Sequence, residues 1–451
     1  MIPRNLIQDL ENWKKSTARK PLVLRGARQT GKTTLIKLFS QGFANTVTLN
    51  MEHTNDRRFW QGDPSLQQIL RDIELAKGVK IEAGKTLLFI DEIQFEPKAI
   101  ASLRYFCEGL PDLHVIATGS LMELALRQTS FSFPVGRVSF LYLYPLRFDE
   151  FLTAVAPANL VAEIHSLTWK SQLSDSLHAL MKDFFYDYLF VGGMPEVVAR
   201  YQDSKNLLEL ISIKEGLLTS FEEDVPKYAR SSRIETLQFL IQQAPLFAGQ
   251  RIQYANFADS GLQSREMKQA FEILELAMLI QRVPGSYQNT LPLQPSFRVS
   301  PKLLHLDVGL VSHRLSVDQR NLKSGDLNDL FRGSIAEQVV GQELLAIGSL
   351  RRAVPCFWYR NQPGSTAEVD FVIPINGKVI PIEVKSGQTG RLRSLLQFME
   401  AAPHPYAVRI YLGPLRCDDL TTPSGKKFQL LSIPHYLISE LSRILEAWVA
   451  T

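Results

Sequence analysis

The stretch that decides the fold of the N-terminal part is Pro21-Leu22-Val23-Leu24-Arg25-Gly26-Ala27-Arg28-Gln29-Thr30-Gly31-Lys32-Thr33. Positions 26–33 match the pattern G-x-x-x-x-G-K-[S/T], in which successive backbone N–H groups surround a nucleotide phosphate. A short apolar strand precedes the pattern, and apolar side chains with helical spacing follow it as far as Phe39. The pattern therefore lies between a strand and a helix, which is the context that it requires, and it predicts a nucleotide site.

The roles of the loop residues follow from the chemistry of phosphate. We expect Lys32 to reach the β- and γ-phosphates of ATP, and the Thr33 hydroxyl to ligate Mg²⁺. The residues expected to contact the nucleotide are Gly26, Ala27, Arg28, Gln29, Thr30, Gly31, Lys32, Thr33 and Thr34.

Two carboxylates, Asp91 and Glu92, follow the apolar run at 87–90. In an open α/β sheet, ligands bind at the carboxyl ends of the strands. We therefore expect Asp91 to hold Mg²⁺ through water and Glu92 to be the general base that activates the attacking water. Ser120 is expected to sense the γ-phosphate. Arg137 is interpreted either as an arginine finger, within the chain or across a subunit boundary, or as an ordinary surface arginine.

Length and composition favour a multidomain globular protein. A chain of 451 residues with 45% apolar and 21% charged residues is too long for one ordinary core. The three cysteines, Cys107, Cys356 and Cys417, lie far apart, which excludes C-x-x-C metal spacing and favours a reducing, cytoplasmic compartment. No apolar stretch is long enough to span a membrane, and a net charge of +4 does not by itself indicate a nucleic-acid binder.

The periodicity predicts an α/β fold in which a mostly parallel sheet, with strands near 46–49, 87–90, 113–117 and 138–143, is covered on both faces. A winged helix-turn-helix is expected next, with helices at 234–241 and 252–258, a third helix capped by Ser264, and a wing strand at 279–283. The expected divisions are a P-loop core at 1–155, a helical lid or connector at 156–230, the winged helix at 231–317 and a last domain at 318–451.

The last domain contains a spread set of carboxylates. Glu337 is expected on a helix, Asp370 on one strand, and Glu383 with Lys385 on the next strand, where period two places them on the same face. If the two strands are neighbours, Asp370 and Glu383 can chelate Mg²⁺ or Mn²⁺ with help from Glu337, while Lys385 orients the attacking hydroxide. The alternative is an ordinary α/β domain in which these residues form a buried ion pair.

The charge around this set favours a polyanionic substrate. Residues 351–393 contain seven basic and three acidic residues, and two of the three acids are proposed metal ligands. A basic wall around a carboxylate centre suits a nucleic acid with a bound cation.

These motifs together resemble a family. The loop at 26–33, the acidic pair and Gly192-Gly193-Met194-Pro195-Glu196 look like the AAA-type P-loop ATPases of bacteria and archaea that have a C-terminal region of unknown function; Asp307-Val308-Gly309-Leu310, Glu368-Val369-Asp370 and Glu383-Val384-Lys385 resemble that C-terminal region. The resemblance implies an ATPase core, a winged helix and a restriction-endonuclease-like domain of the PD-(D/E)xK type. Val369 stands where that motif usually has a proline, and Gln397 is a further substrate-positioning candidate.

Two main functions are expected from these observations. The first is an ATP-hydrolysing protein coupled to a Mg²⁺-dependent DNA nuclease or DNA-binding domain, with DNA as partner and a homo-oligomer as an open expectation. The second is an ATP-dependent switch or assembly factor whose nuclease-like domain is catalytically inert and serves as a binding surface. An inert domain would leave DNA intact in the presence of Mg²⁺ or Mn²⁺.

Overall fold

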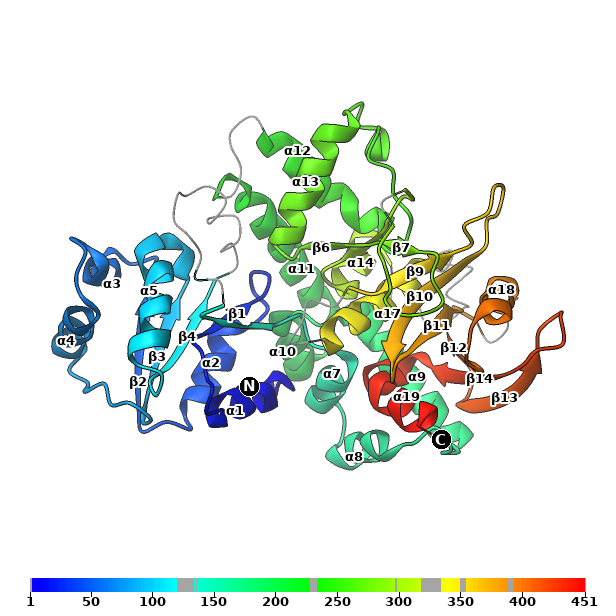
Figure 1. The fold of residues 1–451 in the computed structure, drawn as a ribbon, viewed down its shortest axis with the longest axis horizontal. Coiled ribbons are helices and arrows are strands. Elements are labelled where there is room, and N and C mark those ends of the chain that lie inside the picture. The colour runs from blue at the N-terminus through cyan, green and yellow to red at the C-terminus, as the bar shows by residue number, and fades with distance from the viewer. Residues whose placement is uncertain are drawn as a thin grey trace.

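The structure is a computed structural model, which describes residues 2–119, 134, 136–227, 233–296, 298–317, 334–348, 354–387 and 392–450. Its N-terminal part is built on five parallel strands in the order β2-β3-β4-β1-β5 (Figure 1). The strands are β1 Leu22–Arg25, β2 Asn45–Asn50, β3 Thr86–Asp91, β4 His114–Thr118 and β5 Ser139–Tyr142. The predicted parallel sheet is confirmed.

Alternation along the strands buries both faces of this sheet. Leu22 and Leu24 pack with α1 (Leu6–Lys15) and α2 (Lys32–Ser40) on one face. Val23, between them, packs on the other face, in the cluster that holds apolar side chains of α4 (Leu66–Lys77) and α5 (Pro97–Gly109). Successive residues of a strand point to opposite faces of the sheet. A strand that is apolar at every position is therefore covered by other elements on both faces.

A helical region follows the sheet. It comprises α7 Phe148–Val155, α8 Ala158–Ser166, α9 Asp175–Val191, α10 Pro195–Ser204 and α11 Leu207–Glu223. The predicted break lies between α9 and α10, where Gly192 has a φ of +79° and Pro195 opens the next helix. Gly193 is required by close packing, because a Cβ there would lie 2.1 Å from the carbonyl oxygen of Leu146.

The middle segment differs from the expected winged helix. Helices α12 (Ile234–Gln243) and α13 (Ser264–Leu276) form, and strand β6 (Ile280–Val283) pairs antiparallel with β8 (Lys302–His305). The helix predicted at 252–258 is wrong. Its backbone is diverted, because Ile252 N bonds to the carbonyl of Pro301 and Ala258 has a φ of +51°, leaving only a 3₁₀ turn at Phe257–Asp259.

Ser264 is not the cap of α13. The N-cap position is occupied by Gln263, and it makes no side-chain capping hydrogen bond. The winged-helix identity of this segment stays a prediction.

The C-terminal part contains a mixed seven-stranded sheet in the order β13-β14-β12-β11-β10-β9-β7. Its strands are β7 Gly285–Ser286, β9 Cys356–Tyr359, β10 Glu368–Ile375, β11 Lys378–Val384, β12 Tyr406–Tyr411, β13 Arg416–Thr421 and β14 Lys427–Pro434; the helices around it are α14 Val308–Arg314, α17 Ser334–Ile347, α18 Arg393–Ala401 and α19 Leu441–Val449, with a 3₁₀ turn at His435–Glu440. Because β7 belongs to this sheet, the middle segment and the last domain share structure across residue 317. The boundaries at 155, 230 and 317 stay predictions.

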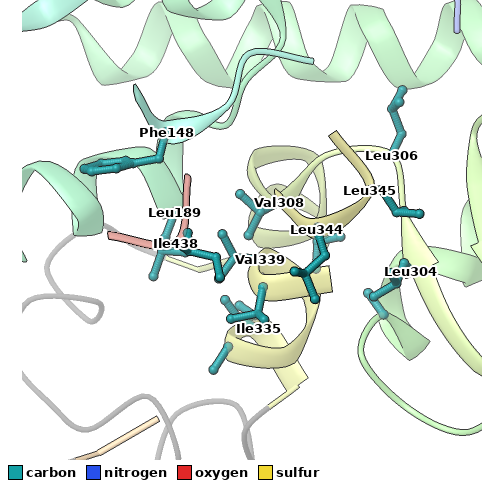
Figure 2. Packing of buried hydrophobic residues seen from close by; sticks show 14 of the residues in the cluster. Phe148, Leu189, Leu304, Leu306, Val308, Ile335, Val339, Leu344, Leu345 and Ile438 are labelled. Atoms are coloured by element: carbon teal, nitrogen blue, oxygen red, sulfur yellow. The ribbon is translucent and has the colours of Figure 1, made fainter. Parts of the chain in front are cut away.

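Helix α17 lies at the centre of the C-terminal core. Figure 2 shows Ile335 and Val339 of this helix close to Ile438 and Val308, which come from segments far apart in the sequence. A helix that is buried on nearly all sides belongs to the middle of a core. The same apolar cluster extends from Ala27 in the phosphate loop to Val449, so packing joins the two halves of the chain.

No helix among the residues that the structure describes is both long enough and apolar enough to cross a lipid bilayer.

Candidate functional site

The phosphate loop connects β1 to α2, as its sequence pattern requires. Gly31 is the N-cap residue of α2 with a φ of +91°, which glycine adopts readily. At Gly26 a Cβ would lie 2.5 Å from the carbonyl oxygen of Leu143, so only glycine fits there. The loop therefore presents its backbone N–H groups at the N-terminus of a helix, where an anion is favoured.

Lys32 is folded over its own loop. Its Nζ donates to the carbonyl oxygens of Gly26 (3.0 Å) and Ala27 (2.8 Å). Burial lowers the pKa of Lys32 to about 8, although the Glu92 and Asp91 carboxylates partly oppose this shift. A phosphate in the loop would supply stronger, charged acceptors for the same ammonium.

The expected magnesium ligands lie together. The Thr33 hydroxyl donates to Oδ2 of Asp91 (2.9 Å), and Thr118 at the end of β4 donates to Oδ1 of the same carboxylate. Hydroxyl and carboxylate oxygens are the ligands that Mg²⁺ prefers. These residues therefore fit a magnesium ion. The expected roles, Thr33 as a direct ligand and Asp91 as a ligand through water, stay predictions.

Glu92 has an unusual backbone next to this pair. Its φ is +51°, a region that non-glycine residues rarely adopt, and its Oε2 accepts a hydrogen bond of 2.5 Å from Nε2 of Gln94. Such outliers cluster at functional sites. The role of Glu92 as general base stays a prediction.

The helical region covers the loop from the side. Arg28 forms a two-oxygen ion pair with Asp224, directly after α11, and Gln29 Nε2 lies 3.3 Å from the hydroxyl of Ser220 in α11. Pro195 is the first residue of α10, and its Cγ lies 3.5 Å from the position that a Cβ on Gly31 would occupy. The loop is thus in direct contact with elements that lead into the middle segment.

Arg4 is a loop contact that the sequence did not suggest. It donates to the carbonyl oxygens of Thr30 (3.1 Å) and Tyr144 (2.6 Å), while its Nε lies 3.1 Å from Glu150. An arginine next to an amphipathic helix has no local signal for such a role. Its partners become visible only in the folded chain.

The remaining N-terminal candidates have different outcomes. Arg137 precedes β5 at the amino end of the parallel sheet, where it pairs with Glu108 at 2.7 Å, whereas the phosphate loop lies at the carboxyl end. In this conformation Arg137 does not reach the loop of its own chain, so it is either an arginine finger across a subunit boundary, which stays a prediction, or an ordinary surface arginine. Thr34 is exposed on α2, and Ser120 lies outside the described residues.

The C-terminal set is brought to one place by neighbouring strands. Strands β10 and β11 are antiparallel with Phe371 opposite Ile382, which puts Asp370 next to Glu383. Asp370 Oδ2 accepts from the backbone N–H of Val384 (2.8 Å), and Lys385 Nζ lies 2.6 Å from Oε1 of Glu383. The expected same-face relationship of Glu383 and Lys385 is present.

A further lysine lies among these carboxylates. Nζ of Lys302, from β8, lies 2.7 Å from Glu337, 2.8 Å from Glu368 and 3.2 Å from Asp370. The Lys302 side chain is only 3% exposed. One ammonium therefore bridges three acidic side chains that come from α17 and β10.

Burial and repulsion decide the ionisation of this cluster. Burial, and next the charge of Asp370, raises the pKa of both Glu337 and Glu383. Burial alone would lower the pKa of Lys302, but the three surrounding carboxylates outweigh burial and raise it, so Lys302 is charged at neutral pH. Oε2 of Glu383 is buried and has no hydrogen-bond partner among the described residues.

As arranged, the predicted metal set of Glu337, Asp370 and Glu383 does not fit a divalent ion. The space between Glu337 and Asp370 is taken by the ammonium of Lys302. Within the described ranges, no three His, Cys, Asp or Glu side chains are grouped so that they could hold a metal ion. Lys302 thus bridges two of the three predicted ligands, Glu337 and Asp370, while Glu383 is paired with Lys385.

Lys302 was missed because it lies in a strand assigned to another module. The available signal was its setting in Lys302-Leu303-Leu304-His305-Leu306, an apolar run that buries the residue. A buried charge needs a partner of opposite charge, so this lysine pointed to an acidic cluster somewhere in the fold.

Comparison with known families gives three matches along the chain. Residues 18–152 match the AAA domain, residues 182–321 a domain of unknown function (DUF8612), and residues 332–436 another domain of unknown function (DUF4143). With the phosphate loop and the Thr33–Asp91 pair, the first match defines the N-terminal part as a P-loop ATPase domain of the AAA type. Comparison with curated proteins gives no match.

Solved structures give only distant similarity. The Walker-type ATPase PABY2304 of Pyrococcus abyssi is 15% identical with a TM-score of 0.43, and the match covers 70% of this chain and 96% of that one. A Thermotoga maritima RuvB variant is 16% identical (TM-score 0.27; 63% and 90% covered). Aeropyrum pernix Orc1, solved in complex with DNA, is 13% identical (TM-score 0.26; 73% and 92% covered). All three TM-scores are below 0.5, so these structures carry no argument about the function of this chain.

Proposed function

We propose that this protein is an ATP-hydrolysing switch whose nuclease-like C-terminal domain binds without cutting, because Lys302 engages Glu337 and Asp370, two of the three expected metal ligands. The observation that carries this proposal is the contact of Lys302 Nζ with Glu337, Glu368 and Asp370 at 2.7, 2.8 and 3.2 Å. The resemblance of its motifs to the PD-(D/E)xK type supports a restriction-endonuclease-like domain, in which Lys302 offsets part of the negative charge of the acidic site.

In the N-terminal domain the chain's residues bind and orient ATP. Loop N–H groups hold the β-phosphate, and Lys32 exchanges the carbonyls of Gly26 and Ala27 for phosphate oxygens. Thr33 and Asp91 hold Mg²⁺, which when bound neutralises charge on the phosphates. Glu92 takes the proton from the attacking water.

The contacts of the loop indicate how hydrolysis is transmitted. Arg28 lies inside the loop and is paired with Asp224 of the helical region, so a nucleotide that repositions Arg28 alters this ion pair. The apolar core continues from Ala27 into α17, which carries Glu337. The loop and the carboxylate cluster are therefore joined through packed elements.

A second candidate is a Mg²⁺-dependent DNA nuclease. The convergence of Asp370, Glu383 and Lys385 favours it, and the cluster is open to solvent, because the side chains of Glu337 and Lys385 are 23% and 21% exposed. This candidate requires Lys302 to leave its carboxylates. Displacing this ammonium is costly, because Lys302 is only 3% exposed and its charge would be left buried without a partner.

A cleavage assay separates the two candidates. Single-stranded, duplex and supercoiled DNA would be incubated with Mg²⁺ or Mn²⁺, with and without ATP, using the wild type and Asp370→Ala. The proposal expects every DNA form to stay intact while ATP is hydrolysed. Cleavage by the wild type that Asp370→Ala abolishes would instead establish the nuclease.

A further inference from the structure

A hollow beside the C-terminal sheet is lined by aromatic, basic and amide side chains. It has a volume of about 560 Å³ and lies between the end of β9, the loop after it, and α18. Its lining residues include Tyr287, Trp358, Arg360, Arg393 and Gln397. A hollow of this size is in the range of small-ligand sites, which is roughly 300–1,000 Å³.

One wall of this hollow is aromatic. Tyr287 is 48% exposed, which is unusual for a large ring, and its backbone carbonyl accepts a hydrogen bond of 3.2 Å from Nε1 of Trp358. Trp358 is itself fixed by an edge contact with Phe398 of α18, at 5.4 Å between ring centroids. The Tyr287 ring itself makes an edge contact with Tyr359, at 6.2 Å between ring centroids. An exposed aromatic ring offers a stacking surface for a base.

The other walls supply positive charge and hydrogen-bonding groups. Neither Arg360 nor Arg393 has a carboxylate partner within the described part of the chain, and the guanidinium of Arg360 donates to the amide oxygen of Gln397, at 3.2 Å. The acid in the hollow, Glu400, is engaged by the backbone N–H of Ser424 at 3.0 Å and by its hydroxyl. The arginines are therefore available for phosphate, and the amide groups for base edges.

The hollow is separate from the carboxylate cluster. Trp358 pairs with Val369 across the two strands, and both face the apolar cluster under α18. Glu368 and Asp370 flank Val369 in the same strand and point to the opposite face, toward Lys302. A ligand in the hollow thus does not need the carboxylates, and it does not depend on a metal there.

We propose that this hollow binds single-stranded nucleic acid, with a base stacked on Tyr287 and backbone phosphates at Arg360 and Arg393. This inference deepens the proposed function, since it gives the non-cutting domain its partner. Stacking on one ring tolerates any base, and phosphate contacts do not read sequence, so we infer binding with little sequence preference.

The test measures binding of fluorescent 12-nucleotide DNA and RNA strands, and of a matched duplex, by anisotropy in EDTA. Tyr287→Ala should weaken strand binding about 10-fold or more, and Tyr287→Phe should retain it. Arg360→Ala and Arg393→Ala should each reduce the slope of log affinity against log salt by about 0.7. Tyr105→Ala and Arg71→Ala, exposed residues of the ATPase domain, are the matched controls.

Several outcomes would overturn this inference. One is that the wild type binds neither strand, and another is that the wild type and Tyr287→Ala bind equally well. A third is that the duplex binds more tightly than the single strands. The last is that free thymidine monophosphate fully displaces the bound strand at the same concentration of nucleotide units. An unchanged ATPase rate shows that each variant is folded. Because EDTA prevents metal-dependent cleavage, discovery of nuclease activity would defeat the proposed function without affecting this result.

Discussion

Nζ of Lys302 in β8 lies 2.7 Å from Oε2 of Glu337 in α17, so a strand preceding the last domain supplies the cation of its acidic site. The two residues are 35 positions apart, and the segment between them includes residues outside the described ranges. This ion pair joins the middle segment to the C-terminal sheet. It is also the contact on which the proposal of a non-cutting domain rests.

Lys32→Ala is expected to lower ATP hydrolysis at least about 100-fold, because the loop loses the ammonium that stabilises charge on the transferring phosphate. Phosphate release under saturating Mg²⁺ and ATP measures this effect. Lys37→Ala, an exposed lysine on the same helix, is the control and should keep the wild-type rate. Equal rates for wild type and Lys32→Ala would remove the loop from the mechanism.

Glu92→Gln should bind ATP with nearly wild-type affinity and turn it over about 100-fold or more slowly, because the amide cannot accept the proton of water. Binding of a fluorescent ATP analogue and single-turnover hydrolysis separate the two effects. Gln94→Ala, which removes the hydrogen bond to Glu92, should have a much smaller effect. A Glu92→Gln variant with normal turnover would require another base.

Glu343→Gln should flatten the pH dependence of stability. Burial, partly opposed by Arg147, raises the pKa of Glu343 to about 8, so between pH 4.5 and 8 the folded state binds more protons than the unfolded state. The contribution of Glu343 to stability is therefore present at low pH and is lost as pH rises through about 8.

Urea denaturation at pH 5, 6, 7 and 8 measures this difference. The free energy of unfolding of the wild type, relative to Glu343→Gln, should fall with rising pH by at most about 1.4 kcal/mol per pH unit. The variant keeps Oε1 as acceptor for Phe148 N and the Tyr188 hydroxyl, so folding is preserved. Parallel curves for the two proteins would show that Glu343 ionises normally.

Gly193→Ala should destabilise the protein by about 3 kcal/mol, because the added methyl group would meet the backbone of Leu146. The control is Gly216→Ala in the interior of α11, where a Cβ meets nothing within 4 Å. There, alanine should stabilise the helix by about 0.5–1 kcal/mol. Thermal unfolding followed by circular dichroism distinguishes these opposite signs. Destabilisation of similar size in both variants would show that crowding at Leu146 is not the cause.

The phosphate loop, Asp91 and the parallel sheet could be predicted because each depends on a local pattern. A strand, a glycine loop and a helix are adjacent in sequence, and apolar runs identify buried strands wherever they occur. Asp370, Glu383 and Lys385 were similarly accessible, since two strands in a hairpin bring them together.

Other features depend on contacts between distant segments. The segment 252–258 has helical spacing, but Ile252 bonds to Pro301, and this tertiary contact overrides local preference. The sequence could not show that Arg137 lies at the amino end of the sheet, because the spacing of residues along the chain does not reveal at which end of the strands a loop lies. Lys302 lies in β8, so its place in the acidic cluster depends on how α17 and β10 pack against that strand.

The central claim is tested most directly by counting bound Mn²⁺ in nucleotide-free protein, by electron paramagnetic resonance, for wild type, Lys302→Met and the double variant Lys302→Met/Asp370→Asn. The wild type should bind no Mn²⁺ at the carboxylate cluster, Lys302→Met should gain one ion, and the double variant should lose it again. If wild-type protein binds one Mn²⁺, and an additional Asp370→Asn single variant loses it, the role assigned to Lys302 is contradicted.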